Sequence, residues 1–294
     1  MPEHAATNVS ADSVVASANQ RGLIAETFRA LAKRRELGLV AYLTAGDPNI
    51  QASEQIILAA AQAGADIIEL GVPFSDPIAD GPTIQRASER SLRAGTTLAQ
   101  VLALAARLKQ KIQTPLVIFS YYNPILQMGL ERFACEARTA SVDGVLATDM
   151  IPEESAEYWK AMDANNLDTI FLAAPTSTNA RIEKIVKATK GFLYLVSRTG
   201  VTGTRDALPI DLAGFVKRVR AVTVMPIAVG FGISQPSHVA ALAGIAEAAV
   251  VGSALVARVE AAHTTEEAVK SVGVLVRELK SAAAQAQTRG GNRP

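Results

Sequence analysis

The stretch DIIELGVPFSDPIADGP, residues 66–82, decides the fold because it contains a complete transition from a strand to a loop. Its first five residues form a short run rich in Ile and Leu without strict polar alternation, as expected of a parallel strand buried on both faces. The Gly, Pro and Asp residues that follow are typical of a loop. Because a helical pattern comes next, the stretch predicts one βα unit.

Seven further runs of this kind occur along the chain, separated by longer helical patterns, which is typical of repeated βα units. Between the first two runs, Asp47 and Pro48 are expected to start a helix and Gly64 to end it. This pattern predicts an α/β fold, a closed (β/α)8 TIM barrel, in preference to a doubly wound open sheet, which looks similar locally. The expected strands are residues 39–43, 66–70, 116–119, 144–147, 169–173, 192–196, 226–229 and 248–251.

We expect a single barrel domain over residues 21–285. No linker rich in Pro, Gly or Ser divides this part of the chain. Residues 1–20 resemble neither a secretory signal nor an Arg-rich transit peptide, so they are interpreted as a short, flexible N-terminal extension. Residues 286–294 are expected to form a polar C-terminal tail.

The composition excludes partners that are bound by bulk charge. The 294 residues contain 29 Lys and Arg against 28 Asp and Glu, which gives a formal net charge of +1. A protein that binds nucleic acid or an acidic membrane usually has a basic excess or a basic stripe. We therefore expect neither nucleic acid nor membrane as a partner.

Cysteine and histidine are too scarce for several common kinds of site. Cys135 is the one cysteine and the histidines are His4, His238 and His263. This excludes an intrachain disulfide and leaves little material for a zinc site or a Ser-His-Asp triad, so we expect no metal. The cysteine usage fits a reducing compartment, and we expect a cytoplasmic location. Carboxylates remain as the candidate catalytic groups.

Glu69 is the leading candidate because it shares a strand face with Ile67, and that face points into the interior of a barrel. Burial without a countercharge should raise the pKa of its carboxyl group and suit it to general acid or base work. An alternative is a buried Glu paired with a distant Arg. Another is a magnesium site formed with Asp76 and Asp80, although either Asp taken alone is an ordinary turn former.

Glycines after the last three strands indicate a phosphate site. Residues 197–204, 230–234 and 252–253 all follow strands and are rich in small residues, so backbone amides can approach an oxyanion closely. Barrel enzymes often bind phosphate between the loops that follow strands seven and eight. No lysine follows a strand, which removes the amine for Schiff-base chemistry. A substrate cleaved by carboxylates must then supply its own electron sink, as a protonated indole ring can.

The segment ELGVPFSDPIADGPTIQ, residues 69–85, resembles the signature of the tryptophan synthase alpha chain family. The resemblance extends over residues 21–280 and includes LTAGDP at 43–48, YYNP at 121–124, SRTGVTG at 197–203 and GFGIS at 230–234. It implies a barrel that splits indole-3-glycerol phosphate into indole and glyceraldehyde 3-phosphate by a retro-aldol reaction. The departures are modest: Tyr42 stands where some members have Phe, and Thr148 precedes Asp149 where others have different small residues.

The resemblance also implies residue roles. Glu69 is the acid–base residue, Asp80 hydrogen-bonds the indole nitrogen, and Tyr194 is the active-site tyrosine. The phosphate contacts are Gly203, Gly232, Gly252 and Ser253, and the indole pocket is lined by Tyr42, Phe119, Leu146, Leu172 and Phe231.

The same resemblance implies a partner, a tryptophan synthase beta chain in an α2β2 heterotetramer. The pyridoxal phosphate belongs to that beta chain, so this chain is expected to need no cofactor of its own. Thr202 belongs to a loop that closes over substrate, and Asp76, Pro77 and Asn123 match interface positions. A stand-alone lyase that releases free indole and a non-catalytic phosphate-binding barrel that activates a partner remain as alternatives.

Overall fold

Strands and helices alternate along the chain in the computed structural model, which describes residues 22–196, 212–230 and 232–286. All strand pairs are parallel, in the order β5-β4-β3-β2-β1-β9-β8-β7-β6. The strands are β1 Gly38–Thr44, β2 Ile67–Gly71, β3 Leu116–Ser120, β4 Gly144–Ala147, β5 Asp168–Ile170, β6 Leu172–Ala173, β7 Leu193–Val196, β8 Ile227–Gly230 and β9 Ala248–Val251.

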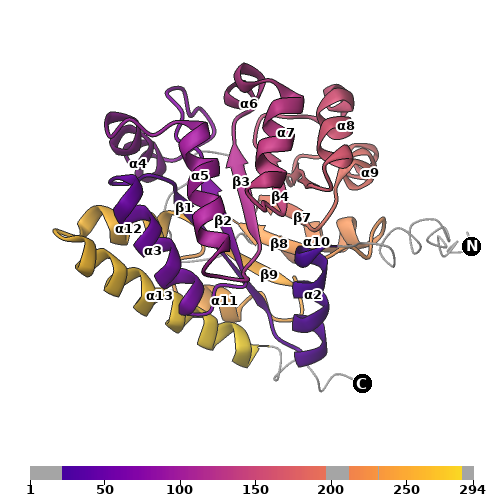
Figure 1. Ribbon diagram of the computed structural model, residues 1–294. Coiled ribbons are helices and arrows are strands. Elements are labelled where there is room, and N and C mark those ends of the chain that lie inside the picture. The colour runs from indigo at the N-terminus through magenta and orange to yellow at the C-terminus, as the bar shows by residue number, and fades with distance from the viewer. Residues whose placement is uncertain (1–21, 197–211, 231, 287–294) are drawn as a thin grey trace, which may run out of the picture.

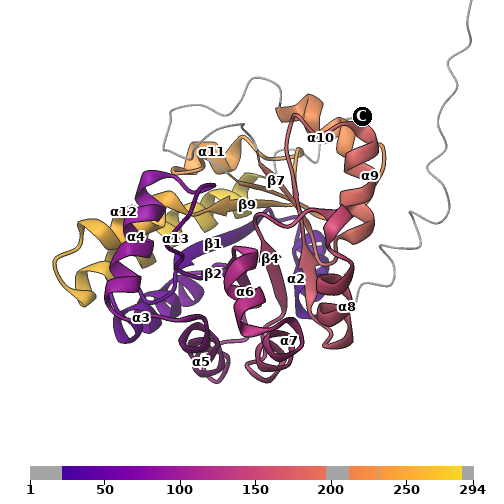
Figure 2. The same ribbon diagram turned by 90° about the horizontal axis from the view of Figure 1, so that it is seen from above.

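Helices surround this sheet on its outer side, except the first described helix, which lies across one end of it (Figures 1 and 2). They are α2 Leu23–Arg34, α3 Ile50–Gln62, α4 Pro82–Arg93, α5 Leu98–Lys109, α6 Tyr122–Met128, α7 Leu130–Thr139, the 3-10 turn Pro152–Glu154, α8 Ala156–Ala164, α9 Asn179–Ala188, α10 Leu212–Arg220, α11 Pro236–Ala240, α12 Ser253–Ala261 and α13 Thr265–Ala286. The end strands of the order, β5 and β6, follow each other in the chain, so the parallel strands form a nearly closed barrel and the predicted TIM barrel is confirmed.

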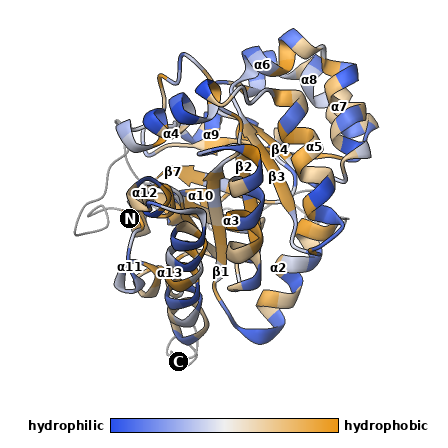
Figure 3. Ribbon diagram, turned by 60° about the vertical axis from the view of Figure 1, so that its left-hand side comes forward, coloured by the Kyte–Doolittle hydropathy of each residue, from blue (hydrophilic) through white to orange (hydrophobic). Residues whose placement is uncertain are grey.

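The strands are buried on both faces, which explains their nearly continuous apolar sequences. Figure 3 shows the strands as hydrophobic, whereas the surrounding helices also carry hydrophilic residues. One set of strand residues packs against the helices and forms the larger core. The alternate set, which includes Val40, Ile67, Val117 and Leu146, fills the barrel interior.

Helix α2 closes the end of the barrel at which the strands begin. Its residues Ile24, Phe28 and Leu31 belong to the interior cluster, and the Phe28 and Phe192 rings lie 5.7 Å apart. The barrel is therefore open at its other end, where the strands terminate, and a site can lie there.

Two local predictions were wrong. The expected strand 169–173 is two short strands, β5 and β6, separated at Phe171. Asn49, and not Asp47, caps α3: its side chain accepts a hydrogen bond from the Ala52 amide, whereas Asp47 pairs with Arg90. Gly64 does follow the end of that helix, with a φ of 107°.

No helix in the described ranges is both long enough and apolar enough to span a membrane.

Candidate active site

Glu69 lies in the centre of β2 and is completely buried, with 0% of its surface exposed. Its neighbours in register are Tyr42 on β1 and Val117 on β3. Neither carboxyl oxygen has a hydrogen-bond partner among the described residues. Burial raises the pKa of Glu69 to about 8. The predicted rise is confirmed, and the described part of the chain supplies no arginine to pair with this carboxyl group.

Asp80 lies in the loop that joins β2 to α4. The Tyr121 hydroxyl donates to its Oδ2 at 3.2 Å and accepts from the Ala79 amide at 2.9 Å. The Gln85 side chain donates to the Asp80 carbonyl at 2.9 Å. Burial raises the pKa of Asp80 to about 6, and the hydrogen bond from Tyr121 opposes this rise.

The two carboxyl groups therefore differ in charge at neutral pH. With pKa values of about 8 and about 6, Glu69 is mostly protonated and Asp80 is mostly ionised. A pair of carboxyl groups in which one holds a proton and the other a negative charge is a common arrangement for acid–base catalysis.

Tyrosines and apolar side chains surround these carboxyl groups. Tyr194 and Leu146 belong to the interior cluster, with Phe119 and Leu172 packed against it. The rings of Tyr42 and Phe119 meet edge to face at 5.0 Å. Burial raises the pKa of Tyr42 and of Tyr194 well above the ordinary value, and the nearby charges of Glu69 and Asp80 raise both further. The structure thus brings the predicted catalytic residues together.

Two glycines make room for the tyrosine hydroxyl groups. A Cβ on Gly71 would lie 2.2 Å from the Tyr42 hydroxyl, and a Cβ on Gly230 would lie 2.2 Å from the Tyr194 hydroxyl. In both cases the glycine ends the strand next to the one that carries the tyrosine. The Tyr42 hydroxyl finds its partner in Thr44, at 3.5 Å.

The expected phosphate residues lie at the start of α12 and after β8. Gly252 is the N-cap of α12 and Ser253 is its first residue. The first amides of a helix have no partner within the helix and lie at the positive end of its dipole, which favours an anion. Gly232 has a φ of 87°, a conformation suited to glycine. Gly203, Thr202 and Phe231 lie outside the described residues.

The expected interface residues lie on the surface in segments that follow strands, at the end of the barrel where the strands terminate. Asp76 and Asn123 are exposed and Pro77 is half-buried, while the adjacent Ile78 is 84% exposed. Within the described ranges, no three His, Cys, Asp or Glu side chains come together as a metal site. Glu69, Asp76 and Asp80 are all described residues and do not form such a group, so the structure gives the magnesium alternative no support.

Tyr121 is a member of the site for which the sequence predicted no role. It follows β3 and reaches across to the loop after β2, where its ring also packs on Phe74 at 5.1 Å. The signal that could have found it is its position at the end of a strand, inside the YYNP motif.

Comparisons with known proteins agree with this geometry. A family model described as "Tryptophan synthase alpha chain" matches residues 28–284. Proteins of that name from Solibacter usitatus and Geobacter sulfurreducens are 52% and 48% identical to the chain, over 81% and 88% of its length and 89% and 98% of theirs. A solved tryptophan synthase structure from Mycobacterium tuberculosis has a TM-score of 0.82 at 35% identity, covering 89% of this chain and 98% of the other. A tryptophan synthase alpha chain from Legionella pneumophila has a TM-score of 0.83 at 32% identity, covering 93% and 100%.

Proposed function

The chain belongs to the tryptophan synthase alpha chain family, and we propose that Glu69 and Asp80 carry its cleavage of indole-3-glycerol phosphate. The enzyme is a lyase of tryptophan biosynthesis. The observation that carries the residue assignment is the fully buried Glu69, with a pKa of about 8, which shares the neighbouring Tyr42 and Tyr194 with an Asp80 whose pKa is about 6.

Glu69 supplies the proton that starts the reaction. Its protonated carboxyl gives a proton to carbon three of the indole ring, which becomes a cationic indolenine. The carboxylate so formed then removes the proton from the side-chain hydroxyl group next to the ring. The carbon–carbon bond breaks, its electron pair restores the neutral indole, and the hydroxyl-bearing carbon becomes the aldehyde of glyceraldehyde 3-phosphate.

Asp80 stabilises the cation between these two proton transfers. Its ionised carboxylate accepts a hydrogen bond from the indole nitrogen, where the positive charge develops. A fixed negative charge in a buried site favours such a charge more strongly than water does. Tyr194 and the apolar side chains hold the ring, while the amides at Gly232, Gly252 and Ser253, together with Gly203, hold the phosphate.

A beta chain is the partner of this lyase, and we place it in an α2β2 heterotetramer that receives the indole. The pyridoxal phosphate resides in the beta chain. Asp76, Pro77 and Asn123 form part of the contact surface, and the exposed Ile78 beside them supports this, since an interface core favours apolar side chains. The single cysteine is consistent with a cytoplasmic location.

The substitution Glu69→Gln tests the assignment of the acid–base residue. We expect indole release to fall by about 10²- to 10⁴-fold, the usual contribution of a positioned acid or base. Binding of indole-3-glycerol phosphate, measured by calorimetry, should stay within about threefold because the amides and the apolar wall are unchanged. Turnover at the wild-type rate would remove Glu69 from the mechanism.

The partner is tested by measuring indole release with and without an added beta chain. A strong increase on mixing supports the complex. An unchanged rate would indicate a stand-alone lyase. No release under either condition would indicate a non-catalytic barrel.

A further inference from the structure

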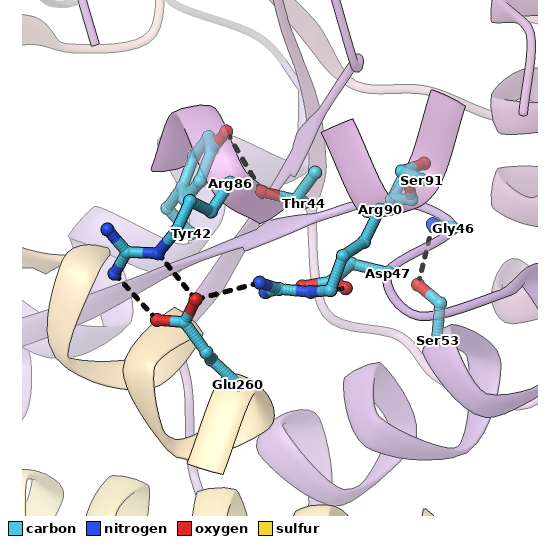
Figure 4. A network of polar contacts seen from close by, with 10 residues as sticks. Tyr42, Thr44, Gly46, Asp47, Ser53, Arg86, Arg90, Ser91 and Glu260 are labelled. Carbon is cyan, nitrogen blue, oxygen red and sulfur yellow. Dashed lines mark hydrogen bonds and ion pairs between the residues drawn. The ribbon is translucent and has the colours of Figure 1, made fainter. Parts of the chain in front are cut away.

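Four charged side chains form a continuous chain of ion pairs outside the carboxyl pair (Figure 4). Arg90 donates from Nε and NH2 to the two oxygens of Asp47, both at 2.8 Å. Its remaining nitrogen, NH1, donates to Glu260 Oε1 at 2.9 Å. Arg86 donates to both oxygens of Glu260, at 2.6 and 2.8 Å. Arg90 therefore uses three nitrogens to bridge two carboxylates.

This network joins three elements that meet at the active site. Asp47 lies in the loop after β1, whereas Arg86 and Arg90 lie one turn apart on α4, the helix that begins directly after Asp80. Glu260 lies in the last turn of α12, the helix that begins at Ser253. The network thus connects α4, the helix that follows Asp80 in the chain, to α12, the helix whose first amides are proposed to bind the phosphate.

The same two helices also share an apolar contact beneath the ion pairs. Ile84 and Ala87 of α4 pack with Val256 of α12 and with Tyr42 of the site wall. The spacing of these residues places them on the inner faces of the helices. Polar and apolar contacts together therefore fix α4 against α12.

The Asp47–Arg90 end of this network differs from an ordinary surface ion pair, whereas Arg86 at the other end is half exposed. Asp47 is 3% exposed, so its charge depends on Arg90 for compensation. Both arginines pair in the two-pronged manner, which fixes orientation as well as distance. The Ser91 hydroxyl donates to the Ala45 carbonyl at 2.7 Å and secures the same loop to α4.

We propose that Glu260, through its contact with Arg90, is a positioning residue of the cleavage reaction, one that fixes Asp80 relative to the phosphate end of the site. The proposal rests on the proposed function, in which Asp80 contacts the indole nitrogen and the start of α12 contacts the phosphate. These groups lie at opposite ends of one substrate. The distance between α4 and α12 therefore decides whether both ends are held at once, and a displacement of about 1 Å is costly to catalysis.

Glu260→Gln is the variant that tests this, because it removes the negative charge that holds both arginines and leaves Asp47 paired with Arg90. Removing Arg90 itself would leave the buried Asp47 charge uncompensated and endanger folding. Glu54→Gln is the matched control. Glu54 likewise accepts from two cations, Arg107 at 2.7 Å and Lys111 at 2.6 Å, and it links α3 to α5.

We expect Glu260→Gln to lower kcat about tenfold with KM within about threefold, since the substrate contacts remain and only their alignment changes. Glu54→Gln should leave both constants within about twofold. In an Asp80→Asn background, Glu260→Gln should have almost no further effect, because the residue that it positions has already lost its charge. An equal loss in both backgrounds, or a Glu260→Gln enzyme that matches Glu54→Gln, would overturn the proposal.

A second measurement keeps this test separate from that of the proposed function. If the wild-type chain releases no indole either with or without a beta chain, the proposed function fails, and inorganic phosphate then serves as the probe. Phosphate should slow the hydrogen exchange of α4 amides in the wild type and in Glu54→Gln, but not in Glu260→Gln. The same slowing in all three proteins would overturn the positioning role.

Discussion

At the scale of single residues, burial and hydrogen bonding together separate the pKa values of the two carboxyl groups. Glu69 has no described partner for either oxygen, whereas Asp80 accepts from the Tyr121 hydroxyl. Burial raises both pKa values, and it raises that of the completely buried Glu69 further, whereas the hydrogen bond from Tyr121 to the ionised form lowers the pKa of Asp80. Tyr121 therefore helps to keep Asp80 charged at a pH where Glu69 holds its proton, without needing to touch the reacting atoms.

The substitution Tyr121→Phe tests this role through the pH profile. Without the hydroxyl, the pKa of Asp80 should rise above about 6. Because Asp80 acts in its ionised form, the acidic limb of the kcat/KM profile should move to higher pH by about one unit, roughly the loss of a hydrogen bond to a charged group. Indole release measured from pH 5 to 9 checks this.

Tyr122→Phe is the control for that experiment. Tyr122 is the next residue, at the start of α6, and its ring packs on Tyr158. The pH profile of kcat/KM for the Tyr122→Phe variant should coincide with that of the wild type. If the Tyr121→Phe profile also coincides with the wild type, Asp80 does not depend on Tyr121.

The inward face of its strand and the missing countercharge nearby made Glu69 the leading candidate from the sequence, although they left other uses of a buried Glu open. It predicted no role for Tyr121, since the partner carboxylate is 41 positions away in the chain. The Arg90 bridge was missed for the same reason: its partners Asp47 and Glu260 are 43 and 170 positions away. Spacing along the chain shows which face a residue occupies, but it does not show which distant residue meets it.

At the scale of elements, the pocket is shaped by pairs of neighbouring strands, of which one carries a tyrosine and the other ends with a glycine. β1 and β7 each present a tyrosine, and β2 and β8 each end with a glycine that leaves room for it. A side chain on either glycine would occupy the space of a tyrosine hydroxyl. The two pairs are therefore expected to be sensitive to the smallest substitution.

Gly230→Ala is expected to displace the Tyr194 ring and to lower kcat/KM for indole release by about 10- to 100-fold, since small misplacements in a site are costly. Gly273→Ala is the control. Gly273 lies inside α13, where a Cβ meets nothing nearer than 4.0 Å. That variant should keep full activity and gain up to about 1 kcal/mol in unfolding free energy. Equal kcat/KM values in the two variants would contradict the expected clash at Tyr194.

The existence of the strands was predictable from their apolar runs, whereas the residues at which elements begin and end were less predictable. Every expected run overlaps a strand, because both faces of each strand are buried and the sequence is therefore nearly continuously apolar. The break at Phe171 was missed because the run stays apolar through it. Asp47 was expected to cap α3 as an ordinary Asp before Pro, but its carboxylate is committed to Arg90, and Asn49 caps the helix.

At the scale of the whole molecule, buried carboxyl groups should make stability depend on pH. Burial raises the pKa of Asp168 to about 7, against an attraction to Lys190, and raises that of Glu69 to about 8. The folded state therefore holds more protons than the unfolded chain between about pH 4 and 8. Stability contributed by these groups is present at low pH and is lost as the pH rises through the folded values.

Asp168→Asn and Glu69→Gln should each raise the unfolding free energy relative to the wild type, by a margin that grows by roughly 3 kcal/mol from pH 5 to 8. Urea unfolding at several pH values measures this. The exposed Glu266→Gln on α13 serves as the control and should run parallel to the wild type. Parallel profiles for the buried variants as well would show that these carboxyl groups do not couple folding to pH.

The division of the fifth strand run has a consequence for association between molecules. β5 bonds to β4 and β6 bonds to β7, while Phe171 joins β5 to β6 through the chain itself. The Lys190 amide also donates to the Thr169 carbonyl, so the lower half of the run is bonded on its second side. An open sheet offers a row of free amides and carbonyls on which another chain can add a strand. Because β5 and β6 are joined through Phe171, the described sheet has no long free edge of this kind. Aggregation is therefore expected to begin from partly unfolded molecules and not from the native barrel.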